Sequence, residues 1–250
     1  MINFPDINPV IVNVGPLSIR WYGVMYIIGI CTSYFLVKYQ IQKRKLQVTT
    51  EEIQSIYLFL IFGLFIGARL GYVVFYDFAY YLRHPLEALA VWNGGMSFHG
   101  GLIGAVCAGI IYAVKYKPDS WRLSDIIFVT VPIGLGLGRL GNFINGELYG
   151  RVTDVPWGMV FPSGGPLPRH PSQIYEFLLE GVILFSILWL IKDKDFKPGT
   201  LTSIFLILYG LFRVIVEFLR EPDSQIGYLI GFITMGQVLS LGMVSLGIGI

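Results

Sequence analysis

The chain has 250 residues, of which 54% are hydrophobic and only 14% are charged, and its mean hydropathy is +0.66. Soluble proteins carry about 25% charged residues, so a water-soluble globule of this composition would expose much apolar surface, and we expect an integral membrane protein. The formal net charge of +2 and the absence of a large basic cluster exclude a nucleic-acid partner. Cys31 and Cys107 both lie within apolar stretches, which excludes a disulfide framework and a cysteine-based metal site.

The N-terminal segment MINFPDINPVIVNVGPLS has no basic region and no small-residue cleavage pattern after its first apolar run. We therefore predict no removable signal peptide, and the first apolar helix is expected to stay in the protein.

Seven apolar runs follow, each long enough for a helix to cross a bilayer. The predicted spans lie near 20–38, 53–76, 97–114, 123–140, 173–191, 200–219 and 228–250. The fourth and fifth are the least regular, because Asp125 lies near the start of one and Glu176 and Glu180 lie inside the other. The sequence predicts an all-α integral membrane protein, a bundle of about seven transmembrane helices in which residues 1–250 form a single domain.

The lysines indicate the orientation of these spans. All eight fall in or beside the loops after spans one, three and five: Lys38, Lys43, Lys45, Lys115, Lys117, Lys192, Lys194 and Lys197. Short loops rich in basic residues stay on the cytoplasmic side. We therefore expect a periplasmic N-terminus and a cytoplasmic C-terminus.

The arginines are distributed differently, because every basic residue assigned to the outer half is an arginine. Arg69, Arg139 and Arg213 lie near the outer ends of spans two, four and six, each shortly after a glycine. A guanidinium keeps its charge, and its planar fork matches a phosphate bidentately, which lysine cannot do. The pattern predicts an anionic lipid headgroup as the partner. The alternative is that each arginine pairs with a carboxylate within the bundle or extends to the interface.

Residues 138–151 read GRLGNFINGELYGR and combine four glycines with Asn142, Asn145, Glu147 and two arginines. Glycine weakens a helix by about 1 kcal/mol per residue relative to alanine, and irregular backbone at membrane depth is tolerated only inside protein or beside a wet cavity. We predict a polar pocket that opens outward at this segment. The alternative is an ordinary helix exit followed by turns.

At this segment the sequence closely resembles the prolipoprotein diacylglyceryl transferase family, whose signature matches GRLGNFINGELYGR. The resemblance extends to WYGVMY at 21–26, GARLGYV at 67–73, GGMSFHGGLIG at 94–104, LPRHPSQIYE at 167–176 and YGLFRVIVEFLREPD at 209–223. Tyr149 replaces a tryptophan that is common in the family, and the outer loop 152–168 is short compared with some members. Both departures concern how the acceptor peptide is held more than the activity itself.

The resemblance implies an enzyme of the bacterial inner (cytoplasmic) membrane that transfers the diacylglyceryl group of phosphatidylglycerol to the thiol of the lipobox cysteine of a preprolipoprotein. Its expected partners are phosphatidylglycerol, the preprolipoprotein signal peptide and membrane lipid. The leaving group is glycerol phosphate, which is anionic and needs preorganised cations. No metal and no cofactor is expected, and attack at the glyceryl carbon agrees with the lack of a cluster of acidic magnesium ligands.

The resemblance also implies roles for residues in the matching segments. Arg139 and Arg213 are expected to clamp the lipid phosphate, and Glu217, four residues after Arg213, to orient its guanidinium or to form a purely structural pair. We expect Asn142, Glu147 and Gly150 to form the pocket wall and contact the headgroup.

Aromatic and histidine side chains complete the predicted site. His99, at the outer start of span three, is the candidate to take the thiol proton. Tyr22 and Tyr209 match aromatic positions near outer helix ends, where interfacial tyrosine is also common without a catalytic role. His170 is expected to contact the headgroup or the acceptor, or to be a turn histidine, and Arg69 is a further candidate for binding the substrate.

Two other classes of function remain as alternatives. A transporter or flippase for an anionic lipid or solute would also use broken helices with charged groups, although the three glycine-and-arginine spans run the same way and indicate a site facing one side. An intramembrane serine protease is disfavoured, because Ser97 and Ser163 lack the setting of a nucleophile paired with a histidine.

Overall fold

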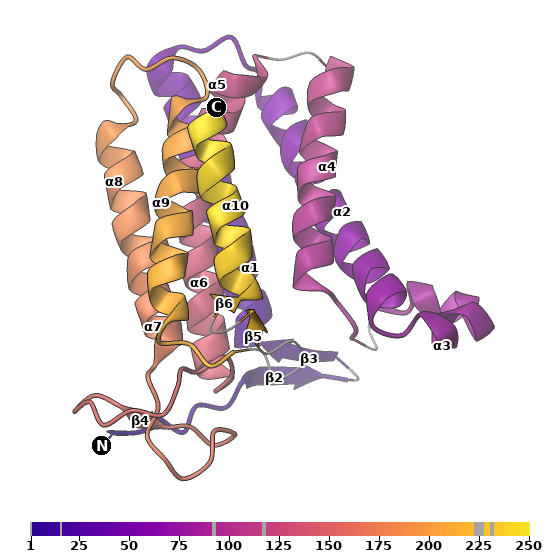
Figure 1. The fold of residues 1–250 in the computed structure, drawn as a ribbon. Helices are drawn as coiled ribbons and strands as arrows, with labels where there is room; N and C mark the ends of the chain where they lie inside the picture. The colour runs from indigo at the N-terminus through magenta and orange to yellow at the C-terminus, as the bar shows by residue number, and fades with distance from the viewer. Residues whose placement is uncertain (1, 16, 92–93, 117–118, 223–227, 231–232) are drawn as a thin grey trace. The chain divides into compact units, whose positions relative to one another are not determined.

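The computed structural model describes residues 2–15, 17–91, 94–116, 119–222, 228–230 and 233–250. The predicted all-α membrane fold is confirmed (Figure 1). The chain forms two compact units: unit 1 comprises residues 1–40 and 121–250, and unit 2 comprises residues 41–120. The single domain expected from the sequence stays a prediction.

Most of the helices belong to unit 1. They are α1 (Trp21–Arg44, of which residues up to 40 belong to this unit), α5 (Ser120–Phe128), α6 (Val131–Ile144), α7 (Ser172–Glu176), the π-helix η3 (Phe177–Ile183), α8 (Leu184–Ile191), α9 (Thr200–Glu217) and α10 (Met235–Gly249). Unit 2 contains α2 (Thr50–Phe75), α3 (Phe78–Arg83), the 3-10 helix η1 (Pro85–Leu89) and α4 (Phe98–Tyr116).

Six helical stretches of the described residues are long and apolar enough to cross a membrane: 21–44, 50–75, 99–116, 120–144, 172–191 and 200–217. They match the first six predicted spans. The seventh differs, because α10 has 15 residues and follows strand β6 instead of filling 228–250. At about 1.5 Å per residue it is roughly 22 Å long, less than the hydrocarbon thickness of about 30 Å. The predicted orientation of the termini stays a prediction.

Three short strand pairs lie in unit 1. β1 (Ile2–Asn3) pairs in parallel with β4 (Met159–Val160), with Ile2 opposite Met159. β2 (Val10–Val14) and β3 (Leu17–Arg20) form an antiparallel hairpin that leads directly into α1. β5 (Tyr228–Ile230) and β6 (Ile233–Thr234) form a second antiparallel pair before α10.

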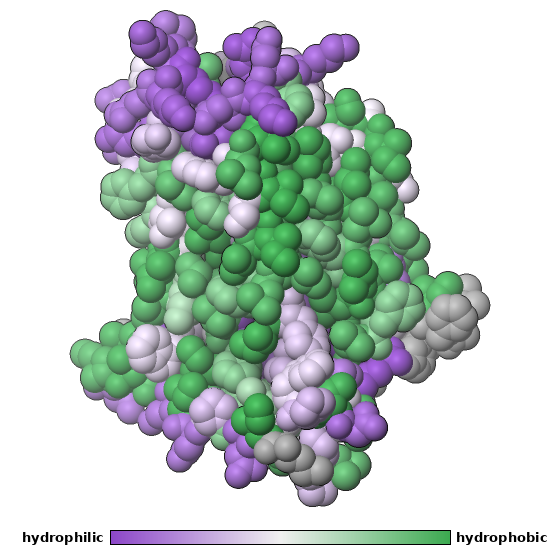
Figure 2. All heavy atoms as spheres, turned by 90° about the vertical axis from the view of Figure 1, so that its left-hand side faces the viewer, coloured by the Kyte–Doolittle hydropathy of each residue, from purple (hydrophilic) through white to green (hydrophobic). Residues whose placement is uncertain are grey.

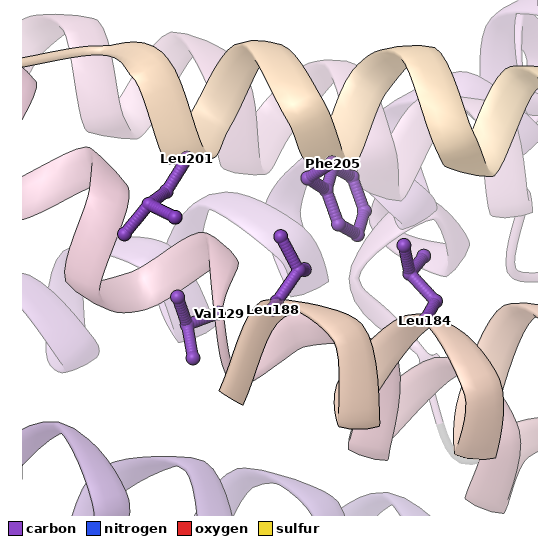
Figure 3. Packing of buried hydrophobic residues seen from close by; sticks show 5 residues of the cluster. All are labelled: Val129, Leu184, Leu188, Leu201 and Phe205. Atoms are coloured by element: carbon purple, nitrogen blue, oxygen red, sulfur yellow. The ribbon is translucent and has the colours of Figure 1, made fainter. Parts of the chain in front are cut away.

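The core of unit 1 is an apolar cluster between α8, α9 and the junction of α5 with α6. Figure 3 shows its five fully or nearly fully buried members: Val129, Leu184, Leu188, Leu201 and Phe205. Lipid-facing surface is apolar too, so packing here depends on shape and dispersion more than on exclusion of water.

Asp125, which made the fourth span irregular in the sequence, caps another helix. Its carboxylate accepts hydrogen bonds from the backbone N–H of Gly199 (2.8 Å) and from the N–H and hydroxyl of Thr202 (2.8 and 2.9 Å). The first backbone N–H groups of a helix have no partner within the helix. Asp125 therefore fixes α5 to the start of α9, which is a structural role.

Hydrophobic side chains form a broad band between two hydrophilic ends on the face of unit 1 shown in Figure 2. Helix α8 contributes to this band, and Leu190 is 79% exposed. An exposed apolar band is the expected surface of a protein surrounded by lipid.

The two long helices of unit 2 approach each other through glycines. Gly63, Gly67 and Gly71 of α2 lie against Gly100 and Gly104 of α4, so closely that an added Cβ at Gly104 would lie 2.1 Å from the carbonyl oxygen of Gly63. Helices α2 and α4 therefore run side by side in Figure 1 with backbone in contact. This is the small-residue packing typical of membrane helices.

We predict that Gly104→Ala lowers the stability of unit 2, because the new methyl group must push α2 and α4 apart. Overpacking of this kind costs about 1–3 kcal/mol. Thermal unfolding of the purified protein in detergent should show a lower midpoint. Gly109→Ala on the same helix is the matched control, since its Cβ would meet only a Leu60 side chain at 3.7 Å; equal midpoints for the two variants would refute the prediction.

Candidate functional site

Arg139 and Arg213 lie in unit 1 and share one carboxylate. Arg139 comes from α6, Arg213 from α9, and Glu176 is the last residue of α7. The Nε atom of Arg139 lies 2.5 Å from Oε2 of Glu176, and Nη1 of Arg213 donates to Oε1 of the same carboxylate. Glu176 is only 1% exposed. One buried carboxylate thus holds the two arginines that the sequence analysis placed first.

Glu217 makes the contact with Arg213 that its spacing predicted. Its Oε2 atom lies 2.9 Å from Nη2 of Arg213 and 3.8 Å from Nη1 of Arg220. The other oxygen accepts a 2.9 Å hydrogen bond from the hydroxyl of Thr234, the N-cap residue of α10. Glu217 therefore positions Arg213 and also ties α9 to the start of α10.

A third glutamate completes the group. Glu180 of η3 is 0% exposed, and its Oε2 atom lies 3.8 Å from Nη2 of Arg139. We call the whole group the arginine–glutamate cluster; its members are Arg139, Arg213, Arg220, Glu176, Glu180 and Glu217.

The pairing of arginines with carboxylates, which the sequence left open as an alternative to a lipid clamp, is present for both Arg139 and Arg213. Removing one partner of a buried pair is costly, since it leaves an uncompensated charge. The guanidinium groups are nevertheless not saturated: within the described residues neither Nη1 of Arg139 nor Nε of Arg213 donates a hydrogen bond. The carboxylates therefore orient both guanidinium groups and leave donors for a further anion.

The signature segment, residues 138–151, covers the last turns of α6 and the turn that follows this helix. Oε1 of Glu147 accepts hydrogen bonds from the side-chain amides of Asn142 (2.9 Å) and Asn145 (3.0 Å). The chain turns through Gly146 and Leu148, whose φ angles are +65° and +58°. The structure brings the predicted residues Asn142 and Glu147 together, and it shows Asn145 as a third member.

This turn is also fastened to the start of α7. Gln173 donates a 2.6 Å hydrogen bond from Nε2 to the carbonyl oxygen of Glu147, and the Ser172 hydroxyl donates to the carbonyl of Leu148 at 2.9 Å. Because α7 ends at Glu176, the signature segment and the arginine–glutamate cluster form one connected site.

The outward polar pocket expected at the signature segment is still a prediction. Two apolar hollows of the described residues lie elsewhere. One, of about 610 Å³, is lined by α2 and α4 within unit 2, and the other, of about 200 Å³, lies between α6 and η3. Neither includes a residue of 139–151.

Gly150 has a packing reason for being glycine. An added Cβ would lie 2.5 Å from the carbonyl oxygen of Leu219 and 2.6 Å from Cβ of His170. The backbone of this segment bonds to both neighbours, since Gly150 N–H donates to the His170 carbonyl (2.8 Å) and Arg151 N–H to that of Leu219 (2.9 Å). Gly150 therefore lets three segments close next to the site, and we assign it no headgroup contact.

Tyr22 lies against the same part of α6. A Cβ on Gly141 would meet the Tyr22 ring at 2.7 Å, and the Tyr22 hydroxyl lies 3.2 Å from that of Tyr26. Tyr209, one turn before Arg213, is partly buried and stacks on Phe205 with ring centroids 5.7 Å apart. Both tyrosines thus belong to unit 1 and pack around the helices that carry the arginines.

His170 lies outside the apolar spans, beside Tyr175 and Trp157. Its Nδ1 atom is 3.1 Å from the Tyr175 hydroxyl, which accepts a 2.7 Å hydrogen bond from the indole N–H of Trp157. Burial lowers the pKa of His170 below its usual value, and the charge of Asp154 opposes this only in part. The folded protein therefore favours the neutral imidazole.

Arg69 and His99 lie in unit 2. All five N–H groups of the Arg69 guanidinium donate to backbone carbonyls, at 2.6–3.3 Å: those of Glu87, Ala88, Ala90, Gly94 and Gly95. No N–H remains for a phosphate in this arrangement, so Arg69 organises the connection between α3 and α4 and does not take the predicted headgroup contact. His99 is exposed at the start of α4, as expected.

The sequence analysis missed Glu176, Glu180 and Arg220 as site residues. Glu176 and Glu180 appeared only as irregularities of an apolar span. A carboxylate inside an apolar span is itself a signal of function, because its burial is costly unless a partner is near. That rule alone would have added both residues.

Comparison with known proteins decides the family. A model of the prolipoprotein diacylglyceryl transferase family matches residues 9–250. The chain belongs to this family. It is 53% identical to the phosphatidylglycerol–prolipoprotein diacylglyceryl transferase of Desulfotalea psychrophila, covering 98% of this chain and 92% of that protein.

The protein of the same name from Geobacter sulfurreducens is 52% identical, over 98% of this chain and 94% of that protein. The one from Vibrio parahaemolyticus is 51% identical, over 99% of this chain and 90% of that protein. The resemblance of the signature segment to this transferase family is thus confirmed, and the transporter and protease alternatives are set aside. With six apolar helices in the part of the chain that the structure describes, this member of the family is a multi-pass protein of the bacterial inner membrane.

We predict that Gly141→Ala lowers transferase activity by displacing the Tyr22 ring from α6. A shift of about 1 Å in a site group can reduce a rate about 100-fold. Gly134→Ala, on the same helix but with open space around its Cβ, is the control. Initial rates of the two variants at equal protein should separate; rates that match each other and the unchanged protein would remove Tyr22 from the site.

We also predict a pH dependence of stability that comes from His170. Its pKa is lower in the folded protein than in the unfolded chain, so the unfolded state binds more protons as the pH falls below about 6.5. Stability should therefore fall from about pH 6.5 downward and level off below the folded pKa. Thermal midpoints between pH 8 and pH 5 should fall less in His170→Gln than in the unchanged protein, and identical pH slopes would show that another group is responsible.

Proposed function

We propose that this chain transfers the diacylglyceryl group of phosphatidylglycerol to the thiol of the lipobox cysteine of a preprolipoprotein and releases glycerol phosphate. The observation that carries the proposal is the arginine–glutamate cluster, in which Arg139 and Arg213 from two different helices meet at the carboxylate of Glu176. The cluster is joined to the family signature by the Glu147–Gln173 hydrogen bond.

In this reaction the C–O bond between the glyceryl carbon and the phosphate breaks, and a C–S bond forms to the cysteine. The phosphate keeps the electron pair of the broken bond, so negative charge grows on it in the transition state. Fixed cations that meet this charge lower the barrier, and they do so most strongly where water is excluded. Arg139 and Arg213 are positioned for this task.

The glutamates make the arginines a preorganised pair. Without them, two long side chains would lose rotamer freedom on binding each substrate. Glu176 and Glu217 hold both guanidinium groups in place beforehand. The N–H groups at Nη1 of Arg139 and Nε of Arg213 then donate hydrogen bonds to the phosphate oxygens.

The other site residues supply contacts around the phosphate. We assign Asn142 and Glu147 to the glycerol headgroup, because amides and a carboxylate match its hydroxyl groups. Tyr22 and Tyr209 are assigned to the wall around the lipid. His170, with its neutral imidazole, is assigned to the side that receives the acceptor peptide.

The thiol must lose its proton, since only a few per cent of a cysteine with a pKa of about 8.5 is thiolate at neutral pH. His99 is the proposed acceptor. Imidazole is the side chain most often used as a general base, because its unperturbed pKa lies near neutral pH.

The proposal is tested with purified protein, phosphatidylglycerol labelled in its acyl chains, and a lipobox peptide with or without its cysteine. Label should move to the cysteine-containing peptide alone. Arg139→Lys and Arg213→Lys keep the charge but lose the planar fork; the lost charge-assisted hydrogen bonds, about 1.5–3 kcal/mol each, correspond to rates about 10- to 150-fold lower.

Arg83→Lys serves as the matched control, because Arg83 is exposed at the end of α3 in unit 2. It should keep the rate of the unchanged protein. Normal rates for both Arg139→Lys and Arg213→Lys would eliminate the clamp, and absence of label transfer in a folded sample would reject the proposed reaction.

A further inference from the structure

Glu180 stands apart from the other carboxylates of the arginine–glutamate cluster. It is completely buried, on the π-helix η3, and neither of its oxygens accepts a hydrogen bond within the described residues. Its only ion pair there is the long contact of 3.8 Å with Nη2 of Arg139. Glu176, four residues earlier, receives close contacts from Arg139 and Arg213.

This position is held by the backbone. Gly181 of η3 and Gly136 of α6 lie in contact, with an added Cβ at Gly136 only 3.0 Å from Cα of Gly181. Arg139 follows Gly136 by about one turn, and Glu180 directly precedes Gly181. The glycine contact therefore fixes Glu180 beside Arg139 at a site where it gains no hydrogen-bond donor. Single π-helical turns often occur at functional sites.

The groups that face Glu180 come from every helix packed around it: Arg139 from α6, Glu176 from α7, Tyr209 and Arg213 from α9, and Arg220 beyond the end of α9. An ionised carboxylate in such a place is normally satisfied by two or three donors. A carboxyl group that lacks them is far less costly to bury when it carries a proton.

The lipid phosphate gives this proton a function. In the proposed function the phosphate brings a negative charge to Arg139 and Arg213, two arginines whose charges also act on Glu180. An ionised Glu180 would repel the phosphate, whereas a neutral Glu180 leaves the charge of Arg139 to the phosphate. Binding of the lipid and protonation of Glu180 therefore favour each other.

We propose that phosphatidylglycerol binds together with a proton that resides on Glu180. The proposal rests on the proposed function, in which Arg139 and Arg213 receive the lipid phosphate. The proton comes from solvent when Glu180 is ionised in the free protein. Glu180 is thus a positioning residue. When it is neutral, it no longer competes with the phosphate for the positive charge of Arg139.

The test is lipid binding as a function of pH. A short-chain phosphatidylglycerol is titrated into the detergent-solubilised protein by calorimetry between pH 5 and 9, in two buffers of different ionisation enthalpy. Proton uptake appears as a difference in apparent enthalpy between the buffers. Linkage of one proton lowers the affinity about tenfold per pH unit where Glu180 is ionised in the free protein.

Glu180→Gln is neutral at every pH and nearly isosteric. It should bind phosphatidylglycerol at pH 8 to 9 with the low-pH affinity of the unchanged protein, and the buffer-dependent proton uptake should disappear. Glu180→Met provides a second neutral variant that buries no amide. The thermal midpoint of each variant is measured to check that it is folded. Glu51→Gln, an exposed position at the start of α2, should keep the pH slope and the proton uptake of the unchanged protein.

The possible failures are distinguishable. Binding without proton uptake, or the same pH slope in folded Glu180→Gln and Glu180→Met as in the unchanged protein, would overturn the role of Glu180 and leave the proposed function in place. Absence of phosphatidylglycerol binding at any pH would overturn the proposed function and this inference with it. Titration of His170 affects all variants equally and therefore cannot produce the expected difference.

Discussion

The bond of two arginines to one buried carboxylate is the interaction on which the site depends. An arginine inside a membrane helix is tolerated only when a partner compensates its charge, and here Glu176 serves Arg139 and Arg213 at once. Three helical segments therefore have to meet at one point. Moving Arg139, Arg213 or Glu176 by one position along its helix would separate the guanidinium groups from the carboxylate by several ångströms. Charges would then be buried without partners.

Glycine contacts make this meeting point possible. Gly136 and Gly181 let α6 approach η3, Gly141 accommodates the Tyr22 ring, and Gly150 admits the backbone of Leu219 and His170. In each case the side chain that is missing would occupy the space of a neighbour. The same device joins α2 to α4 in unit 2, where Gly63 and Gly67 lie against Gly104. Close backbone approach is thus a general packing mode of this chain, and the site uses it to set distances between charges.

The sequence was sufficient for the class and the first six spans, and it named Arg139, Arg213 and Glu217, which the structure brings together. The length of an apolar run, about 20 residues, follows from the thickness of the bilayer. The i, i+4 spacing of Arg213 and Glu217 predicts their contact. Two kinds of information were beyond it. The 15-residue helix α10 was taken for a full span because an apolar composition does not reveal where a strand ends and a helix begins. Contacts between distant segments, such as Glu176 with two arginines, depend on how helices pack, which composition does not encode.

Arg69 and Arg139 show why an arginine near a helix end does not define its own role. Both follow a glycine in the second half of an apolar span, and the sequence pattern does not distinguish them. In the fold, the five N–H groups of Arg69 all meet backbone carbonyls, which are neutral and already fixed. Arg139 instead meets carboxylates, which can lose their charge and leave the guanidinium free to attract another anion. A guanidinium whose N–H groups all bond to carbonyls stabilises a loop. A guanidinium paired with titratable acids can attract a phosphate when one of these acids is neutral. This difference in partners distinguishes a structural arginine from one suited to a lipid headgroup.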